Sequence, residues 1–171
     1  CQNWDISQDP SSGVPIDSRQ LALVMKSLRT EGVLNINFVG GEPTPNLHTI
    51  VEAMNQLDLN VPMLWNSNMY CSEEAMQILA DLIDIWLPDF KYGNDKCAIR
   101  LSKVPRYFEV VARNHAFAQL NGDMIIRHLV MPNHIECCTR PVLQWVSAHC
   151  PRALVNMMRQ YHPDNRVPAE R

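Results

Sequence analysis

Short apolar runs rich in β-branched residues alternate along this chain with longer segments whose apolar residues recur every three or four positions. The first kind of segment is typical of buried strands and the second of amphipathic helices. One strand and one helix together take roughly 25 to 40 residues, the length that a connection between parallel strands needs. We therefore predict an α/β fold with strands at residues 33–39, 61–65, 83–87, 124–131 and 153–158.

Capping residues mark the intervening helices. Asp17 or Ser18 can begin a helix that ends near residue 30, and Ser72, which two glutamates follow, can begin another that ends near residue 81. Pro105 suits the first position of a helix that ends near residue 121. Three further helices are expected: one that begins at residue 46, one that ends near residue 104 and one that covers residues 139–149.

Five parallel strands can form either an open doubly wound sheet or a curved, partial barrel, and periodicity does not choose between them. The chain of 171 residues can bury one sizeable core, and its 46% hydrophobic and 19% charged residues are not typical of disorder. No second domain is visible. We expect one domain over residues 1–162, followed by a polar tail at residues 163–171.

Charge and composition exclude several classes of protein. The net charge is -3, and no basic stripe with interleaved aromatic residues indicates a nucleic-acid partner. No apolar run reaches the length of a membrane span, so no membrane association is expected. Six cysteines without a disulfide or zinc spacing, together with nine methionines, favour a cytoplasmic location. Because residue 1 is Cys1 and not Met, the natural N-terminus is expected to lie upstream.

Residues 35–45, with the sequence NINFVGGEPTP, are the most informative segment. Gly40 and Gly41 end a predicted strand and allow the backbone to turn with positive φ close to a ligand. Glu42 can accept from an ammonium group, and ligand sites of parallel α/β folds lie at this end of the strands. The alternative is a tight turn with a helix-capping acid.

This segment, together with Cys1-Gln2-Asn3, resembles the radical S-adenosylmethionine (SAM) superfamily. The likeness is to proteins related to pyruvate formate-lyase activating enzyme, of unassigned substrate, and it runs from Cys1 to about His162. In the superfamily, a C-x-x-x-C-x-x-C loop holds a [4Fe–4S] cluster and a G-G-E-P segment binds the methionine part of SAM. An electron from the cluster then cleaves SAM to a 5′-deoxyadenosyl radical, which abstracts hydrogen.

The resemblance implies a partial (β/α)6 TIM-like barrel of parallel strands whose first strand is missing from this sequence. It implies that Cys1 is a ligand of the cluster and that Gly40, Gly41, Glu42 and Pro43 bind SAM. The other two cluster cysteines are expected three and seven residues before Cys1. The parent protein is therefore predicted to be a radical SAM enzyme, whereas this chain alone is expected to be inactive.

Residues after the later strands extend the resemblance. Asn66 and Ser67 occupy the place of an Asp-Thr-Asn-Gly segment near SAM, although Asn66 replaces the acid, and a plain polar loop is nearly as good an interpretation. Asp89 and Lys91 match the family's Asp-x-Lys, in which the lysine neutralises the SAM carboxylate and the aspartate holds a cation or the lysine. A solvated turn is the alternative there.

Arg127 interrupts an apolar strand, so it must be paired or functional. It matches the family's R-x-x-V-x-P pattern, which implies contact with the SAM carboxylate. His128 is expected on the opposite face, between strand and helix. The resemblance places His162 near the adenine of SAM, and a structural cap is the alternative.

The remaining thiols have simpler interpretations. His134, Cys137 and Cys138 suggest a metal, but too few cysteines lie nearby for an extra cluster, so we interpret the two thiols as helix-start residues. Ordinary buried or core positions are expected for Cys71, Cys97, Cys150, Trp65 and Trp86.

The predicted partners are a glycyl-radical protein, whose backbone glycine would be the substrate, and an electron donor. Two rivals stay open: a radical SAM enzyme that acts on a small molecule or peptide, and a non-catalytic α/β module that binds a nucleotide or phosphate at Gly40 and Gly41.

Overall fold

The structure is a computed structural model that describes residue 9 and residues 13–162. It contains a five-stranded parallel sheet, and all five predicted strands are present, each shorter than or shifted slightly from its apolar run. The strands are β1 (Ile36–Phe38), β2 (Met63–Trp65), β3 (Ile85–Trp86), β4 (Asp123–Leu129) and β5 (Leu154–Met158).

Helices connect successive strands, and the predicted caps are confirmed where side chains satisfy free backbone donors. The carboxylate of Asp17 accepts from the backbone N–H of Gln20, whose side chain accepts from Asp17 in return, and the Ser72 hydroxyl accepts from Ala75. The helices are α2 (Ser18–Thr30), α3 (Leu47–Met54) after a short 3₁₀ turn η1 (Thr44–Asn46), α4 (Glu73–Ala80), α5 (Asp95–Ser102), α6 (Tyr107–Leu120), and α7 (Arg140–His149) after a π-turn η2 (Ile135–Thr139).

The prediction that Pro105 opens a helix is wrong by two residues. Lys103 and Arg106 both have left-handed backbone conformations, with φ of 60° and 48°. These conformations end α5 and form a turn through Pro105, so that α6 begins at Tyr107. The shift matters for the site, because it aims the Tyr107 side chain at the loop after β3.

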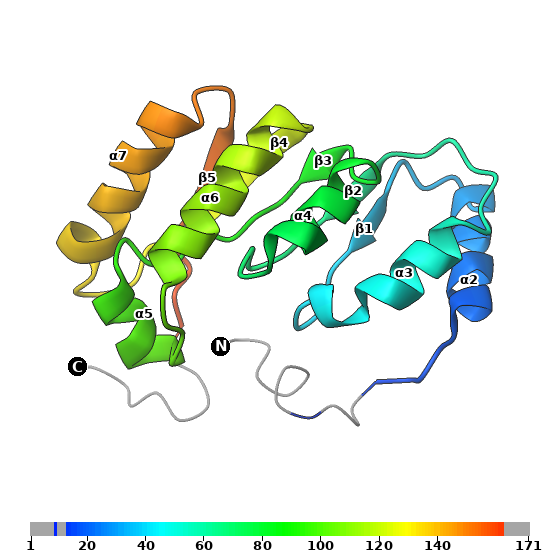
Figure 1. The fold of residues 1–171 in the computed structure, drawn as a ribbon, viewed down its shortest axis with the longest axis horizontal. Helices are drawn as coiled ribbons and strands as arrows, with labels where there is room; N and C mark the ends of the chain where they lie inside the picture. Colours follow the sequence, from blue (N-terminus) through cyan, green and yellow to red (C-terminus); the bar gives the residue numbers. More distant parts are fainter. Residues whose placement is uncertain (1–8, 10–12, 163–171) are drawn as a thin grey trace.

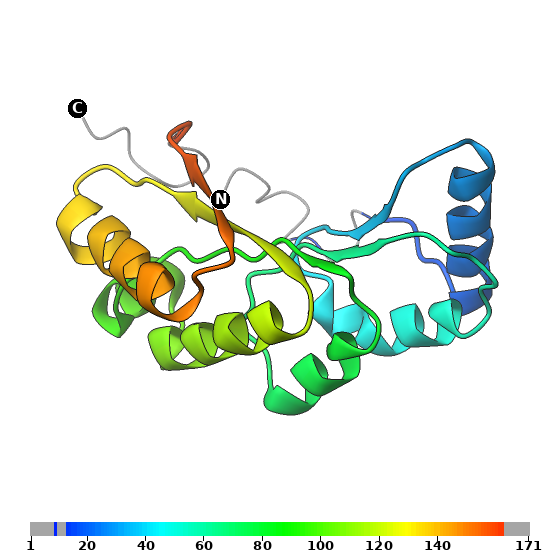
Figure 2. The same ribbon diagram turned by 90° about the horizontal axis from the view of Figure 1, so that it is seen from above.

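The winding of the chain decides between the two architectures. The strands lie in sequence order, β1-β2-β3-β4-β5, and α3, α4, α6 and α7 follow in the same order along the sheet (Figure 1). Seen from above, these helices cover one face of a curved row of strands (Figure 2). A doubly wound sheet reverses direction at a switch point and has helices on both faces. The fold is therefore the curved, barrel-type arrangement, consistent with a partial TIM-like barrel.

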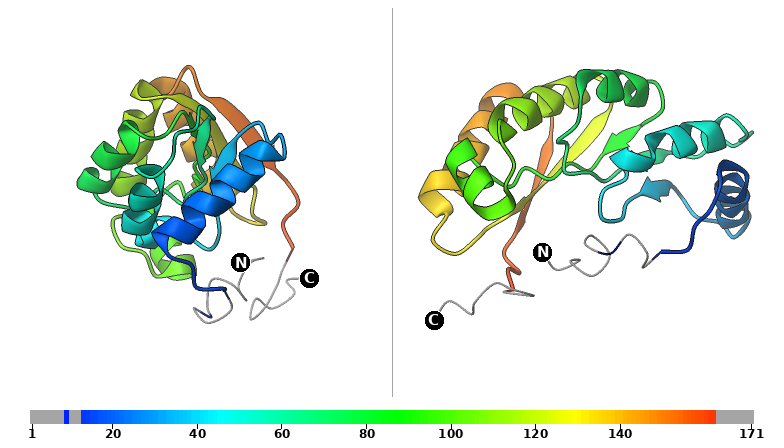
Figure 3. Two further views of the ribbon diagram at one scale, coloured as in Figure 1. Left: turned by 90° about the vertical axis from the view of Figure 1, so that its right-hand side faces the viewer. Right: turned by 60° about the horizontal axis from the view of Figure 1, so that its bottom comes forward.

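The core fills the space between the strands and these helices. Trp65 and Trp86, predicted as core residues, are fully buried there, and so is Phe90 just after β3. Two further views show the helices on the outside of the curved sheet (Figure 3). Within residue 9 and residues 13–162, no helix has both the length and the apolar character that crossing a membrane requires.

Candidate functional site

A cavity of about 150 Å³ opens where the carboxyl ends of four neighbouring strands meet. Parallel strands in sequence order bring these ends to one edge, which explains why residues far apart in the chain gather there. Gly40 has φ of 151°, and no atom lies within 4 Å of the position that a Cβ would take, so the backbone is open toward a ligand. The lining residues are Val39, Gly40, Gly41, Glu42, Asn66, Ser67, Asn68, Asp89, Lys91 and Arg127.

Glu42 ties the loop after β1 to the loop after β2. Its Oε1 accepts from the hydroxyls of Thr44, at 2.6 Å, and Ser67, at 2.7 Å, while Oε2 accepts from the backbone N–H of Asn68 at 2.9 Å. Ser67 is buried, with 2% of its surface exposed. These three hydrogen bonds fix the orientation of the carboxylate, so Glu42 presents it in one position in the cavity.

Asp89 holds the two cations of the cavity. Its Oδ1 accepts from Nε and from Nη2 of Arg127, at 2.8 and 2.7 Å, and its Oδ2 lies 3.0 Å from Nζ of Lys91. The Asp89 side chain is 14% exposed, against 30% for Arg127 and 40% for Lys91. The prediction that Asp89 holds the lysine and that Arg127 is paired is thus confirmed, and the three side chains leave one net positive charge.

The backbone of the loop after β3 is fixed by groups beneath the cavity. The Tyr107 hydroxyl accepts from the N–H of Lys91 at 2.8 Å, and burial raises the pKa of Tyr107, which keeps this hydroxyl protonated. On the next strand, Nδ1 of His128 donates to the carbonyl of Phe90 at 2.7 Å, and Nε2 then accepts from the hydroxyl of Thr139 at 2.9 Å.

His128 is fully buried between strand and helix, as predicted, and burial lowers its pKa, so the imidazole stays neutral. The loop after β3 is therefore held in place before any ligand binds.

The charges make the cavity suitable for a zwitterion. Lys91 and Arg127 form a positive side that can bind a carboxylate, while Glu42 supplies a negative charge. The open backbone at Gly40 adds unhindered polar groups beside them. An α-amino acid head group, with a carboxylate and an ammonium on one carbon, has this arrangement of charges.

Two of the predicted site residues that the structure describes do not line the cavity. Pro43 is buried next to Glu42 and does not line the cavity, and His162, exposed four residues after β5, does not line it either. Contact of either residue with SAM stays a prediction. Cys1 lies outside the described residues. Asn68 also lines the cavity and was not among the predicted site residues, although its place beside Ser67 in the loop after β2 was a usable signal.

A second group of reactive side chains lies at the other end of the loop after β3. Cys97 at the start of α5 meets His134, Cys137 and Cys138 around η2, and their four donor atoms lie within 4.8 Å of one another. Cys97 is buried, as predicted, and it also meets three other potential metal ligands, which the prediction did not include. Cys71 and Cys150 are half-buried and buried thiols outside this group, as expected.

Electrostatics differ among the thiols of this group. Burial alone would raise the pKa of Cys97, but hydrogen bonds with Cys138, Asn94 and Cys137 and the charge of Arg100 together hold it below the ordinary value. Burial raises the pKa of Cys138 to about 12.

Comparisons with known proteins agree with the fold and leave the activity open. No known protein-family profile matches the chain. It is 45% identical over 170 residues to "Uncharacterized protein MJ0674" of Methanocaldococcus jannaschii, an alignment that covers 96% of this chain and 50% of that protein. The chain thus spans about half the length of this curated relative. The structure of Streptococcus suis SuiB is similar over 94% of this chain and 38% of its own, with a TM-score of 0.68 and 12% identity, which establishes a shared fold.

Proposed function

We propose that this chain carries the SAM-binding part of a radical SAM enzyme. In such an enzyme an electron from a [4Fe–4S] cluster cleaves SAM to methionine and a 5′-deoxyadenosyl radical, which abstracts hydrogen from a substrate. The observation that carries the proposal is that predicted site residues from the loops after three strands, together with Arg127 within a fourth, line one cavity with the charges of an amino acid binding site. The barrel-type fold that the chain shares with Streptococcus suis SuiB supports it.

The described residues fit the methionine end of SAM. Lys91 and Arg127 would bind the SAM carboxylate, since Asp89 neutralises one of their two charges and leaves the other free. Glu42 and the open backbone at Gly40 would face the ammonium group. A cavity of about 150 Å³ suits this head group, and the adenosine would extend along the sheet edge.

The cluster is not accounted for by this sequence. Cys1 alone matches the cluster motif, and among the described residues no cysteine lines the cavity. One thiolate cannot hold a four-iron cluster, which binds through several cysteines. The proposal therefore concerns a longer protein with cysteines three and seven residues before Cys1.

The substrate that we propose is a backbone glycine of a glycyl-radical protein, with a separate electron donor. This part rests on the likeness of Cys1-Gln2-Asn3 and the cavity residues to activating enzymes. We propose a cytoplasmic location because the described cysteines are all free thiols, which a reducing compartment preserves. Residues 1–162 would form part of one catalytic domain, whose first strand lies upstream.

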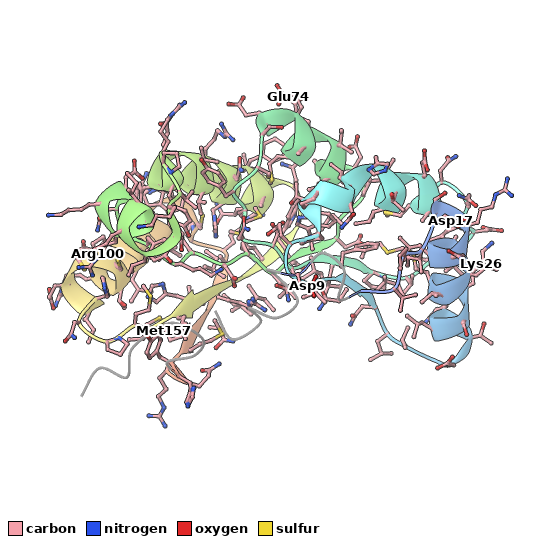
Figure 4. The ribbon with its side chains drawn as sticks, turned by 90° about the horizontal axis from the view of Figure 1, so that it is seen from below. Asp9, Asp17, Lys26, Glu74, Arg100 and Met157 are labelled. Carbon is pink, nitrogen blue, oxygen red and sulfur yellow. The ribbon has the colours of Figure 1, made fainter. Side chains whose placement is uncertain are left out.

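The test uses the longer protein, reconstituted anaerobically with iron and sulfide and titrated with SAM. We expect a brown protein whose cluster spectrum changes on addition of SAM. Lys91→Met and Arg127→Met should each weaken SAM binding about 10-fold or more, because each removes a charged partner of the carboxylate. Lys26→Met removes an exposed cation of α2 (Figure 4) that does not line the cavity, and it should leave the affinity unchanged.

Two results would overturn the proposal. One is a sequence without the two upstream cysteines. The other is a colourless protein that binds ATP or phosphate but not SAM, which would support the nucleotide-binding module. Formation of a glycyl radical on a candidate partner, followed by electron paramagnetic resonance, separates an activating enzyme from one that acts on a small molecule or peptide.

A further inference from the structure

The cluster of Cys97, His134, Cys137 and Cys138 has no part in the cavity and needs its own explanation. We propose that these four side chains bind one Zn²⁺ ion in a closed, tetrahedral, structural site. Three thiolates and one imidazole form a common ligand set for structural zinc. The inference stands apart from the proposed function, because it uses none of the residues proposed to bind SAM.

The distances fit a single ion. Zinc binds sulfur at about 2.3 Å and nitrogen at about 2.0–2.1 Å. In a tetrahedral site these bond lengths separate two sulfurs by about 3.8 Å and a sulfur from a nitrogen by about 3.6 Å. Sγ of Cys137 lies 3.8 Å from that of Cys97 and 4.0 Å from that of Cys138. Nδ1 of His134 lies 3.3, 3.7 and 3.8 Å from Sγ of Cys137, Cys97 and Cys138.

An iron–sulfur cluster fits these positions less well. Its cysteines bind different irons, so their sulfurs stand apart by the width of the cluster. Here all four donor atoms lie within 4.8 Å of one another, around one point. The geometry therefore favours one metal ion over a cluster.

The local fold brings the ligands together through backbone features. Asn94 caps α5 by accepting from the N–H of Cys97 at 2.9 Å, and it donates to the carbonyl of Cys137 at 2.6 Å. Gly93 lies so close to η2 that a Cβ there would stand 2.8 Å from the carbonyl oxygen of Cys138. The π-turn places two consecutive cysteines and His134 on the side that faces α5.

His134 can serve as a zinc ligand if the side chain of Arg100 moves away from it. Its Nδ1 faces the thiols, and its Nε2 lies 3.1 Å from Nη2 of Arg100. A neutral imidazole bound to metal through Nδ1 carries its proton on Nε2, which then cannot accept from Arg100. Arg100, which is labelled in Figure 4, is exposed, so its side chain can turn outward into solvent. Its charge would still offset the net negative charge of three thiolates and Zn²⁺.

The experiment measures metal binding directly in the 171-residue chain. The chain, purified reduced and metal-free, is titrated with Zn²⁺ and Co²⁺ and analysed by native mass spectrometry and absorption spectroscopy. We expect one ion per chain and, with Co²⁺, the thiolate charge-transfer and tetrahedral ligand-field bands. Zn²⁺ should raise the unfolding temperature, and a chelator should reverse the rise.

Cys97→Ser and Cys137→Ser should weaken Zn²⁺ binding more than about 100-fold, since each removes a direct ligand. Cys150→Ser and Cys71→Ser are matched controls, because they remove a buried and a half-buried thiol outside the cluster, and both should bind like the parent chain. Cys1→Ser should also bind normally.

His134→Asn covers the case in which a cysteine variant fails to fold, because His134 is only half-buried. It should keep the thiolate bands of Co²⁺ and change the ligand-field bands. Three results would overturn the inference: a folded parent chain that binds no Zn²⁺, equal binding by the parent chain and Cys97→Ser, or iron with acid-labile sulfide bound through these cysteines.

Discussion

Removing the Asp89 carboxylate should destabilise the protein. Loss of the ion pair with Arg127 should contribute more to this effect than loss of the ion pair with Lys91. Two N–H groups of Arg127 point at one oxygen of a carboxylate that is 14% exposed, whereas Lys91 makes one contact and is 40% exposed. Breaking a fully buried ion pair costs about 3–5 kcal/mol, and breaking an exposed one costs about 0.2–1 kcal/mol. The partly exposed pair of Asp89 and Arg127 belongs between these limits, at about 2 kcal/mol.

A double-mutant cycle isolates this value. Asp89→Asn keeps the shape and removes the charge, and Arg127→Met keeps much of the aliphatic stem. Each single variant should lower the free energy of unfolding by about 2 kcal/mol, which for a chain of this size lowers the unfolding temperature by about 4–8 °C. The double variant should lose much less than the sum, with a coupling energy of about 2 kcal/mol. Lys91→Met should cost about 0.5 kcal/mol.

The assay is urea unfolding followed by circular dichroism, with the slopes compared to confirm a single transition. The matched control is Glu109→Gln, which breaks the Arg106–Glu109 pair on the exposed face of α6 and should cause no measurable change. A coupling energy below about 0.5 kcal/mol would refute the reasoning, because it would mean that solvent screens the Asp89–Arg127 pair as it screens a surface pair.

Two further predictions concern packing and pH. Gly93→Ala should lower the free energy of unfolding in urea by about 2–3 kcal/mol, since the new Cβ would stand 2.8 Å from the backbone of η2. Gly13→Ala is the control and should cause no measurable change, because no atom lies within 4 Å of its Cβ position. Equal effects of the two variants would contradict the close approach of Gly93 to η2. Burial of His115 lowers its pKa to about 4. The unfolded chain therefore takes up a proton below pH 6.5 that the folded chain refuses, and stability should fall by about 3 kcal/mol between pH 6.5 and 4. His115→Phe should flatten this part of the pH profile, and an imidazole NMR signal of His115 that titrates near pH 6.5 in the folded protein would contradict the prediction.

Much of the fold could be predicted because its signals are local. The Asp17 capping box and the Ser72 cap depend on residues three positions apart, and each apolar run predicted its strand. The cavity was also accessible, since parallel strands in sequence order bring their carboxyl ends together, so Asp89 and Arg127 could be placed on one edge without coordinates.

His134, Cys137 and Cys138 drew attention in the sequence, but the addition of Cys97 to this group could not be predicted because it depends on tertiary packing. Cys97 and Cys137 are separated by 40 positions, and no spacing rule links them. Their meeting depends on the missing side chain of Gly93 and on a π-turn at residues 135–139, and neither has a distinctive sequence pattern. The role of Glu42 as a tie between two loops escaped prediction for the same reason, since its partner Ser67 lies 25 residues away.

One short segment, from Asp89 to Cys97, joins the cavity to the proposed zinc site. Any effect of the metal on the cavity therefore depends on the contacts that hold this segment in place. The Tyr107 hydroxyl holds the N–H of Lys91, and His128 holds the carbonyl of Phe90. Tyr107 belongs to α6 and makes no hydrogen bond with the described thiols, whereas His128 is itself held by the Thr139 hydroxyl at the end of η2, so only the Tyr107 contact is independent of the metal site. Loss of zinc should therefore loosen α5 and η2 and lower the unfolding temperature, while the coupling energy between Asp89 and Arg127 should persist. If that coupling energy disappears together with the metal, the Tyr107 contact does not insulate the cavity, and the metal controls its geometry as well as the stability of the fold.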